Sequence, residues 1–241
     1  MVRNFGKRGD WESYNTKSPF PHIVIEDFLE KEVLHNVSKE AYVVCTNPHE
    51  NWRFGGRLNS KDEHEFQQKK RGIAVINNLP YHTKELVNYL NSDGFISKLE
   101  NLTGKRGLIA DPSLVGGGLH ETKRGGYLGI HHDFNTLLIN NEQYYRQINL
   151  LLYINPHWDD SWGGHLEFWN KDIGPSKIVN VKSNRCVIFN IDGAPHGHPH
   201  PLNSPSDISR RSIAMYYYSK EVPQTTEIKR AHWEPELKTI I

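Results

Sequence analysis

From residue 107 onward the chain is a succession of short β-favouring runs, separated by Gly, Pro, Asn and Asp and without a long helical pattern. A parallel α/β fold is the main rival, but its crossover connections need helix-length segments that this region lacks. We therefore expect a β-sandwich or jelly roll here. The predicted strands are residues 107–110, 127–132, 147–155, 165–169, 177–181, 186–190 and 210–219.

The helical patterns of the chain lie before residue 107. A β-like run at 21–25 precedes an amphipathic helix that extends to about residue 42, and a second β-like run at 72–76 precedes two short helices. Thr83 is placed to cap the first of these two helices, and Gly104 to end the second. The apolar positions at helical spacing are Leu29, Val33, Leu34, Val37 and Ala41, then Leu86, Val87 and Leu90, then Phe95, Ile96, Leu99 and Leu102.

One domain accounts for the whole length of 241 residues, because no internal repeat or low-complexity linker divides the chain. The polar stretch 46–71 has no sustained periodicity, and it is predicted to be a long loop in a position to cover a site. We expect a mainly β domain over 1–241, in which a helical buttress at about 1–106 supports a jelly-roll core at about 107–220.

Composition excludes several classes of protein. Lys and Arg number 29 and Asp and Glu 28, so no broad charge points to a nucleic-acid or membrane-surface partner. The two cysteines, Cys45 and Cys186, lie in unrelated contexts, which argues against a disulfide framework or a thiolate zinc site. No run has the length of a signal peptide core or a membrane span. We expect a soluble cytoplasmic protein that acts on a small molecule or a peptide; its oligomeric state stays open.

The pair His131 and Asp133 ends one of the predicted strands. Side chains alternate along an extended chain, so these two share a face and His132 points the other way. An imidazole and a carboxylate, joined by a second histidine, form the two-His, one-carboxylate triad that binds oxygen-activating Fe(II). Such a site keeps three positions on the metal open.

The second histidine is expected from a distant part of the chain, because a jelly roll pairs strands that are far apart in sequence. Three candidates, His196, His198 and His200, lie within the Pro-rich segment 194–201. Spacing alone does not choose among them.

The last predicted strand, 210–219, places a basic residue on each of its faces. Arg210 and Ser212 share one face and Arg211 takes the other. Together Arg210 and Ser212 suit a carboxylate, through charge-assisted contacts and one hydroxyl hydrogen bond.

These motifs occur in an order that resembles the 2-oxoglutarate/Fe(II) oxygenases, and within them the prolyl 4-hydroxylase-like branch. The run at 20–29, Phe-Pro-His-Ile-Val-Ile-Glu-Asp-Phe-Leu, also looks like the usual start of these proteins, so the resemblance covers nearly the whole chain. The motifs are His131-x-Asp133, Leu152-Tyr-Ile-Asn-Pro-His-Trp158, Gly163-Gly-His-Leu-Glu-Phe168, Pro195-His196 and Arg210-x-Ser212.

The resemblance implies a double-stranded β-helix and a role for each motif residue. It makes His131, Asp133 and His196 the metal ligands and assigns Arg210, Ser212 and Tyr153 to the far carboxylate of 2-oxoglutarate. The implied cofactors are Fe(II), 2-oxoglutarate and O₂, with ascorbate as a reductant. The implied reaction hydroxylates an aliphatic C–H bond, of peptidyl or free proline by analogy, and releases succinate and CO₂.

One position departs from the family pattern. Several prolyl hydroxylases have a tyrosine three residues before the first metal histidine, whereas this chain has Leu128 there and Tyr127 one residue earlier. Tyr127 is therefore expected on the other side of the strand, which places a binding role for it in doubt.

Other readings of these residues compete with the oxygenase. A cupin-like metal protein without oxygenation, such as an isomerase or a sensor, would share the fold but has no use for Arg210-x-Ser212. Metal storage or structural zinc at the His-rich segment leaves Asp133 without a purpose. The same oxygenase chemistry on a sugar or another small molecule is a further alternative. We expect His132 and His165 outside the metal shell, Arg211 in a surface or inter-strand contact, and Arg146 in a structural role.

Overall fold

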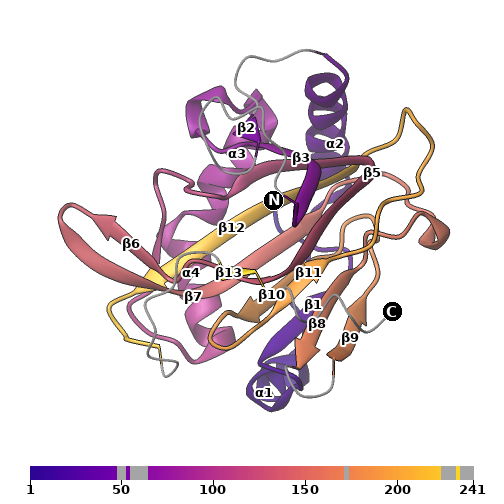
Figure 1. Ribbon diagram of the computed structural model, residues 1–241. Coiled ribbons are helices and arrows are strands. Elements are labelled where there is room, and N and C mark those ends of the chain that lie inside the picture. Colours follow the sequence, from indigo (N-terminus) through magenta and orange to yellow (C-terminus); the bar gives the residue numbers. More distant parts are fainter. Residues whose placement is uncertain (48–52, 55–64, 171–173, 224–231, 234–241) are drawn as a thin grey trace.

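Two layers of antiparallel strands and a group of helices make up the computed structural model, which describes residues 1–47, 53–54, 65–170, 174–223 and 232–233 (Figure 1). The strands hydrogen-bond in the order β1-β10-β7-β12-β5-β11-β8-β9. Their bounds are β1 His22–Ile25, β5 Gly118–His132, β7 Glu142–Tyr153, β8 Leu166–Asn170, β9 Gly174–Val179, β10 Cys186–Asn190, β11 His196–His198 and β12 Arg210–Ser219.

Further strands extend the sheet at its margins. Strand β3 (Gln67–Ile73) pairs with β5 and with β2 (Arg53–Phe54), and β4 (Ile109–Ala110) pairs with β12. Strand β6 (Thr136–Ile139) forms a hairpin with β7, and β13 (His232–Trp233) pairs with the end of β5.

Strand β5 belongs to both layers. Residues Gly118 to Thr122 pair with β12, while Leu128 and His131 pair with β11. Between these halves the strand bends at Gly125, whose φ is +74°, and Gly126. The backbone of Leu202 hydrogen-bonds to both glycines, at 2.8 and 3.0 Å. The bend lets one strand feed a first layer, β1-β10-β7-β12, and a second layer, β11-β8-β9, that close into a nearly complete barrel.

The helices cover the outer face of the first layer (Figure 1). They are α1 (Arg8–Glu12), α2 (Lys31–Thr46), α3 (Tyr81–Leu90) and α4 (Asp93–Thr103), with short 3₁₀ turns η1 (Tyr14–Thr16), η2 (Ile76–Asn78) and η3 (Asp160–Trp162). Their apolar sides join the outward residues of β7, β10 and β12 in one core, because successive strand residues point to opposite faces. That core includes Val37, Ala41, Leu86, Leu90, Phe95, Leu99, Ile148, Leu150, Leu152, Ile188, Ile213, Met215 and Tyr217.

A second core lies between the two layers. Phe168 of β8 and Phe189 of β10 meet across it with ring centroids 5.1 Å apart, and Tyr153 and Leu166 pack beside them. The layers are therefore held together by aromatic and aliphatic burial at one end of the barrel, which leaves the other end for a cavity.

The predicted jelly roll with helical support is confirmed, and two local predictions are wrong. Residues Gln67 to Arg71 belong to strand β3 and not to the predicted loop 46–71, of which 48–52 and 55–64 lie outside the described residues. Thr83 does not cap α3. It is buried in the first turn, where its backbone N–H and its hydroxyl donate to Glu40 of α2, at 2.8 and 2.9 Å.

Gly104 ends α4 as predicted, with the left-handed φ of +75° that glycine adopts at little cost. Strands β10 and β12 have the predicted bounds, whereas β6 and the first half of β5 were not predicted. Across the described part of the chain, no helix combines the length and the apolar character needed to cross a membrane.

We expect Gly126→Ala to lower the free energy of unfolding by about 1–3 kcal/mol, the usual range for overpacking. An added Cβ would lie 2.7 Å from the carbonyl oxygen of Gln68 and 2.8 Å from that of Lys123. The matched control is Gly94→Ala in α4, where a Cβ meets nothing within 4 Å and where stability should rise by about 0.4–1 kcal/mol. Urea denaturation of both variants measures the difference, and equal effects would contradict the role of the bend.

Candidate metal centre and adjoining cavity

A cavity of about 380 Å³ opens between the two layers, within the size range of small-molecule sites. His131, Asp133 and His196 line one part of it, and Arg210 and Ser212 line another. Residues of β12 that share this inner face continue with Ala214 and Tyr216, as strand alternation predicts.

Three potential metal ligands converge in this cavity. One ligand atom from each of His131, Asp133 and His196 lies within 4.8 Å of the other two. Strands β5 and β11 bring the histidines together, because His131 and His196 are directly paired across these strands. Nε2 of His131 lies 3.5 Å from Oδ1 of Asp133, and Nε2 of His196 lies 3.5 Å from Oδ2.

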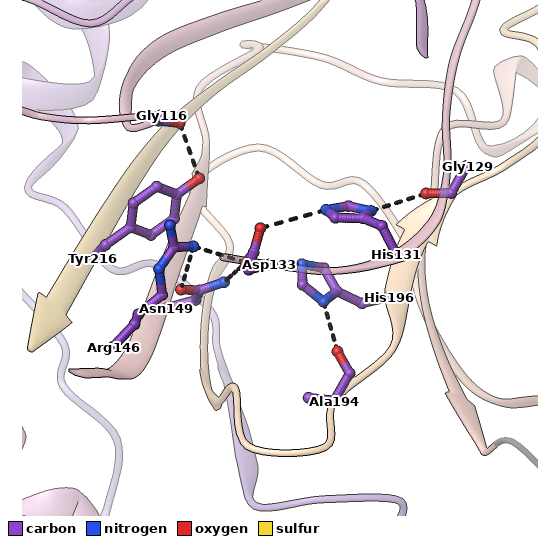
Figure 2. Close-up of polar contacts among 9 residues, drawn as sticks. All are labelled: Gly116, Gly129, His131, Asp133, Arg146, Asn149, Ala194, His196 and Tyr216. Atoms are coloured by element: carbon purple, nitrogen blue, oxygen red, sulfur yellow. Dashed lines mark hydrogen bonds and ion pairs between the residues drawn. The ribbon is translucent and has the colours of Figure 1, made fainter. Parts of the chain in front are cut away.

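Backbone carbonyl oxygens orient both histidine rings (Figure 2). Nδ1 of His131 lies 2.9 Å from the carbonyl oxygen of Gly129, and Nδ1 of His196 lies 2.9 Å from that of Ala194. A carbonyl oxygen only accepts, so each Nδ1 carries the proton and donates it. Each ring therefore turns its other nitrogen, Nε2, toward Asp133, which is how a second partner orients a metal-ligating histidine.

Burial and nearby charges favour an ionised Asp133 and a neutral His196. Burial would raise the pKa of the Asp133 carboxyl, but Arg146 and the two histidines hold it well below its usual range. Burial lowers the pKa of His196 to about 4, although Asp133 opposes that shift. A carboxylate and two imidazole nitrogens thus face one another at 3.5 Å. Such a donor set fits a divalent cation and suits Fe(II).

Arg210, Ser212 and Tyr153, the residues predicted for the anion, lie near one another. Nε of Arg210 donates to the carbonyl oxygen of Gly164 at 2.8 Å, and Nη2 donates to the hydroxyl of Tyr153 at 3.3 Å. Ser212 is buried, and its hydroxyl finds no partner among the described residues. Tyr153 contacts Arg210 without lining the cavity, so it supports the guanidinium from behind.

The Gly163-Gly164 turn packs against Arg210 and holds its side chain in position. Gly164 has a φ of +73°, and a Cβ there would lie 2.4 Å from Leu202 and 3.0 Å from Cδ of Arg210. Only glycine allows this close approach of the turn to the guanidinium stem. The sequence motif therefore has a structural reason that involves the candidate site directly.

Four further basic residues line the cavity, and the sequence did not predict them in this role: Lys70, Arg71, His120 and His198. Burial lowers the pKa of Lys70 to about 8, and Arg210 adds to this effect. Both ring nitrogens of buried His198 are without a hydrogen-bond partner among the described residues. Burial and the charges of Arg210 and Lys70 hold its pKa well below the usual value.

A bulge positions Lys70. The β3–β5 register shifts between Gln68 and Lys70, and Lys69 has a φ of +50°. Bulges often re-aim side chains beside active sites. The signal in the sequence was faint, because Gln67-Gln-Lys-Lys-Arg71 resembles an exposed loop.

The competing residues lie outside the triad. His165 bonds to the backbone of Asp160 and Val181, and His200 lies 3.3 Å from Glu167. Arg211, predicted to make a surface or inter-strand contact, is buried and stacks on Tyr42 of α2, so it does not lie at the surface. His132 belongs neither to the triad nor to the residues that line the cavity.

Tyr127 is also outside the cavity lining. Its hydroxyl donates to the carbonyl oxygen of Glu65 at 2.6 Å. This contact agrees with the expectation that Tyr127 lies on the other side of the strand and does not bind a ligand in the cavity.

Residues 117–218 match the sequence model of the 2OG-Fe(II) oxygenase superfamily. No curated protein sequence matches the chain. The matched segment contains all six residues predicted for the metal and the cosubstrate, and the family's name states the predicted iron and 2-oxoglutarate. The resemblance inferred from the motifs is confirmed.

Solved structures share the fold at low sequence identity. A prolyl hydroxylase from Trichoplax adhaerens, in complex with a hypoxia inducible factor peptide fragment, is 16% identical with a TM-score of 0.62, covering 87% of each chain. A prolyl-4-hydroxylase from Pseudomonas putida is 14% identical with a TM-score of 0.59, over 88% of this chain and 97% of the other. HygX from Streptomyces hygroscopicus, with nickel, 2-oxoglutarate and hygromycin B, is 12% identical with a TM-score of 0.56, over 94% and 96%.

We expect His131→Ala, Asp133→Ala and His196→Ala each to weaken Co(II) binding by more than about a hundredfold, because the loss of an outer partner alone costs about 10–100-fold. Anaerobic calorimetry on the apoprotein measures this. His198→Ala is the control and should bind Co(II) as the wild type does. If His198→Ala loses the metal while His196→Ala retains it, the second histidine has been misassigned.

Proposed function

We propose that this 2-oxoglutarate/Fe(II) oxygenase hydroxylates an aliphatic C–H bond of a small molecule or a peptide, with release of succinate and CO₂. The observation that carries the proposal is the pairing of two features in one cavity. The converging donor atoms of His131, Asp133 and His196 lie in one part of it, and Arg210 and Ser212 lie in another.

In this proposal the protein supplies three ligands and leaves the remaining metal positions open. His131 and His196 bind through Nε2, since Nδ1 of each is committed to a backbone carbonyl oxygen. When bound, iron activates O₂ and 2-oxoglutarate supplies two electrons by oxidative decarboxylation. The fixed imidazole planes and the ionised Asp133 hold the ligand atoms in place, so little reorganisation is needed on metal binding.

The far carboxylate of 2-oxoglutarate is assigned to Arg210 and Ser212. The free hydroxyl of Ser212 and the guanidinium of Arg210 would satisfy that carboxylate, and Tyr153 fixes the guanidinium from the opposite side. Lys70 adds a second cation at the same level of the sheet as Arg210. Thr122 of β5 pairs with Lys70 of β3 on one side and with Arg210 of β12 on the other. Buried polar groups without partners favour a ligand that completes them.

Peptidyl or free proline is the first substrate class to test. Apolar and aromatic side chains, Val75, Val115, Phe134 and Tyr216, line the cavity beyond the metal ligands and suit a small aliphatic ring. The fold shared with two prolyl hydroxylases supports this choice. A sugar is the second class, because the HygX structure that shares the fold over nearly its whole length holds hygromycin B.

The experiment is an assay of succinate release with Fe(II), 2-oxoglutarate, ascorbate and O₂. Amino acids, proline-containing peptides, aminoglycosides and sugar nucleotides are added in turn, and mass spectrometry looks for a product heavier by one oxygen atom. Stimulated succinate release with hydroxylated product supports the proposal. A metal-bound protein that has no affinity for 2-oxoglutarate would favour the cupin-like alternative, an isomerase or a sensor.

We expect Arg210→Met to weaken 2-oxoglutarate binding by about a hundredfold or more, since a buried carboxylate that loses its charged partner costs about 3 kcal/mol or more. Co(II) binding should change little. Arg211→Met, one residue along on the helix-facing side, is the control and should keep the wild-type affinity. The reverse pattern would shift the strand register by one residue.

Lys70 gives a proton-linkage prediction. Its pKa is lowered to about 8 without ligand, and a carboxylate nearby would raise it. Binding of 2-oxoglutarate at pH 8.5 should therefore take up a proton, and affinity should fall as pH rises through about 8. Calorimetry in two buffers of different ionisation enthalpy measures the uptake, and Lys70→Met should abolish it. Equal uptake in that variant would place the titrating group elsewhere.

A further inference from the structure

We propose that Arg146 is a positioning residue that, together with Asn149, holds Oδ2 of Asp133 so that Asp133 offers the metal one oxygen, Oδ1. The inference rests on the proposed metal centre and goes beyond it. Sequence reasoning gave Arg146 only a structural role. It lies four residues into β7, does not line the cavity, and is 1% exposed.

The two shortest contacts of Asp133 are both to Oδ2 (Figure 2), which also lies 3.5 Å from Nε2 of His196. Nη1 of Arg146 lies 2.9 Å from Oδ2 of Asp133, and Nδ2 of Asn149 donates to the same oxygen at 2.6 Å. Nη1 of Arg146 also reaches Oδ1 of Asn149 at 3.5 Å, which closes a triangle of three side chains. Two donors therefore meet one carboxylate oxygen.

The other oxygen of Asp133 has a different neighbour. Oδ1 lies 3.5 Å from Nε2 of His131, whereas the contacts at 2.9 and 2.6 Å from Arg146 and Asn149 are both to Oδ2. Oδ1 therefore keeps its lone pairs toward the cavity, while those of Oδ2 are used by Arg146 and Asn149. A carboxylate held in this way binds a metal through one oxygen and leaves the neighbouring coordination position open.

Arg146 is itself held by aromatic faces. Its guanidinium carbon lies 3.9 Å from the ring centroid of Phe134 and 3.7 Å from that of Tyr216. The hydroxyl of Tyr216 donates to the carbonyl oxygen of Gly116 at 3.0 Å, which fixes that ring. Cation–π contacts of this kind stabilise a desolvated guanidinium and restrict it to one plane. Phe134 and Tyr216 also line the cavity, so the wall beside the metal and the orientation of Asp133 depend on the same side chain.

Charge and position predict opposite results, which makes the proposal testable. If Arg146 mattered only as a positive charge near a cation, its removal would tighten metal binding. If it positions Asp133, its removal should weaken metal binding, because outer partners of metal ligands typically contribute about 10–100-fold.

The experiment measures Co(II) affinity by anaerobic calorimetry, and the Co(II) absorption spectrum, for the wild type, Arg146→Met and Arg146→Lys. We expect Arg146→Met to bind Co(II) about 10–100-fold more weakly with an altered ligand-field spectrum. Arg146→Lys keeps a charged donor without the fixed plane and should lie between the two. Arg211→Met is the matched control, because Arg211 is also buried and stacked on an aromatic ring, Tyr42, but faces the helices.

A second variant removes the dependence on folding, since loss of one partner from a buried ion pair strongly destabilises a protein. Asn149→Ala deletes the other donor to Oδ2 and leaves the charge in place. It should weaken Co(II) binding in the same direction, with a smaller spectral change. Wild-type affinity and an unchanged spectrum in Asn149→Ala, or equal or tighter binding in Arg146→Met, would overturn the inference. Failure of the wild type to bind Co(II) would overturn the proposed metal centre instead.

Discussion

The candidate site depends on one strand that pairs with two layers. Strand β5 leaves the first layer at the bend of Gly125 and Gly126 and enters the second layer beside β11. This path brings His131 opposite His196 and leaves Asp133 at the strand end, facing both rings. The first half of the same strand pairs with β12 and fixes the height of Arg210 and Ser212. The metal donors and the anion site are thus placed by a single backbone.

The cavity combines an apolar lining with a group of buried polar and charged side chains. Aromatic contact between the layers ends near Phe189, whose ring lies 4.9 Å from that of His196. Beyond this point charged groups are buried, and each needs a partner or a ligand. Nη1 of Arg146 pairs with Asp133, whereas Arg210, Ser212, His198 and Lys70 line the remaining space. These groups give the cavity a positive character that favours an anionic cosubstrate.

Sequence reasoning could place the residues whose signal is local. Alternation along 210–219 put Arg210 and Ser212 on one face, and the order of the motifs chose His196 over His198. It could not find Lys70 or the role of Arg146, because both depend on pairings distant along the chain. Lys70 follows a bulge in β3 that no residue pattern predicts. Arg146 contacts Asp133 only because the fold brings β7 close to the end of β5. Thr83 looked like a cap, but Glu40 of another helix supplies the acceptor.

The register of these strands is protected by paired basic residues. Lys70 and Arg71 are adjacent on β3, and Arg210 and Arg211 are adjacent on β12; in each pair one side chain points into the cavity and the next points toward the helices. On the helix side Arg71 bonds to Glu121 and to the carbonyl oxygen of Cys45. A slip of one residue in β5 would exchange the faces, because side chains alternate with a period of two. Glu121 would then enter the cavity beside the site proposed for a carboxylate. Arg71 and Arg211 on the helix side would no longer pair with Glu121. The same charges that suit the cavity to its cosubstrate therefore oppose the misaligned sheet.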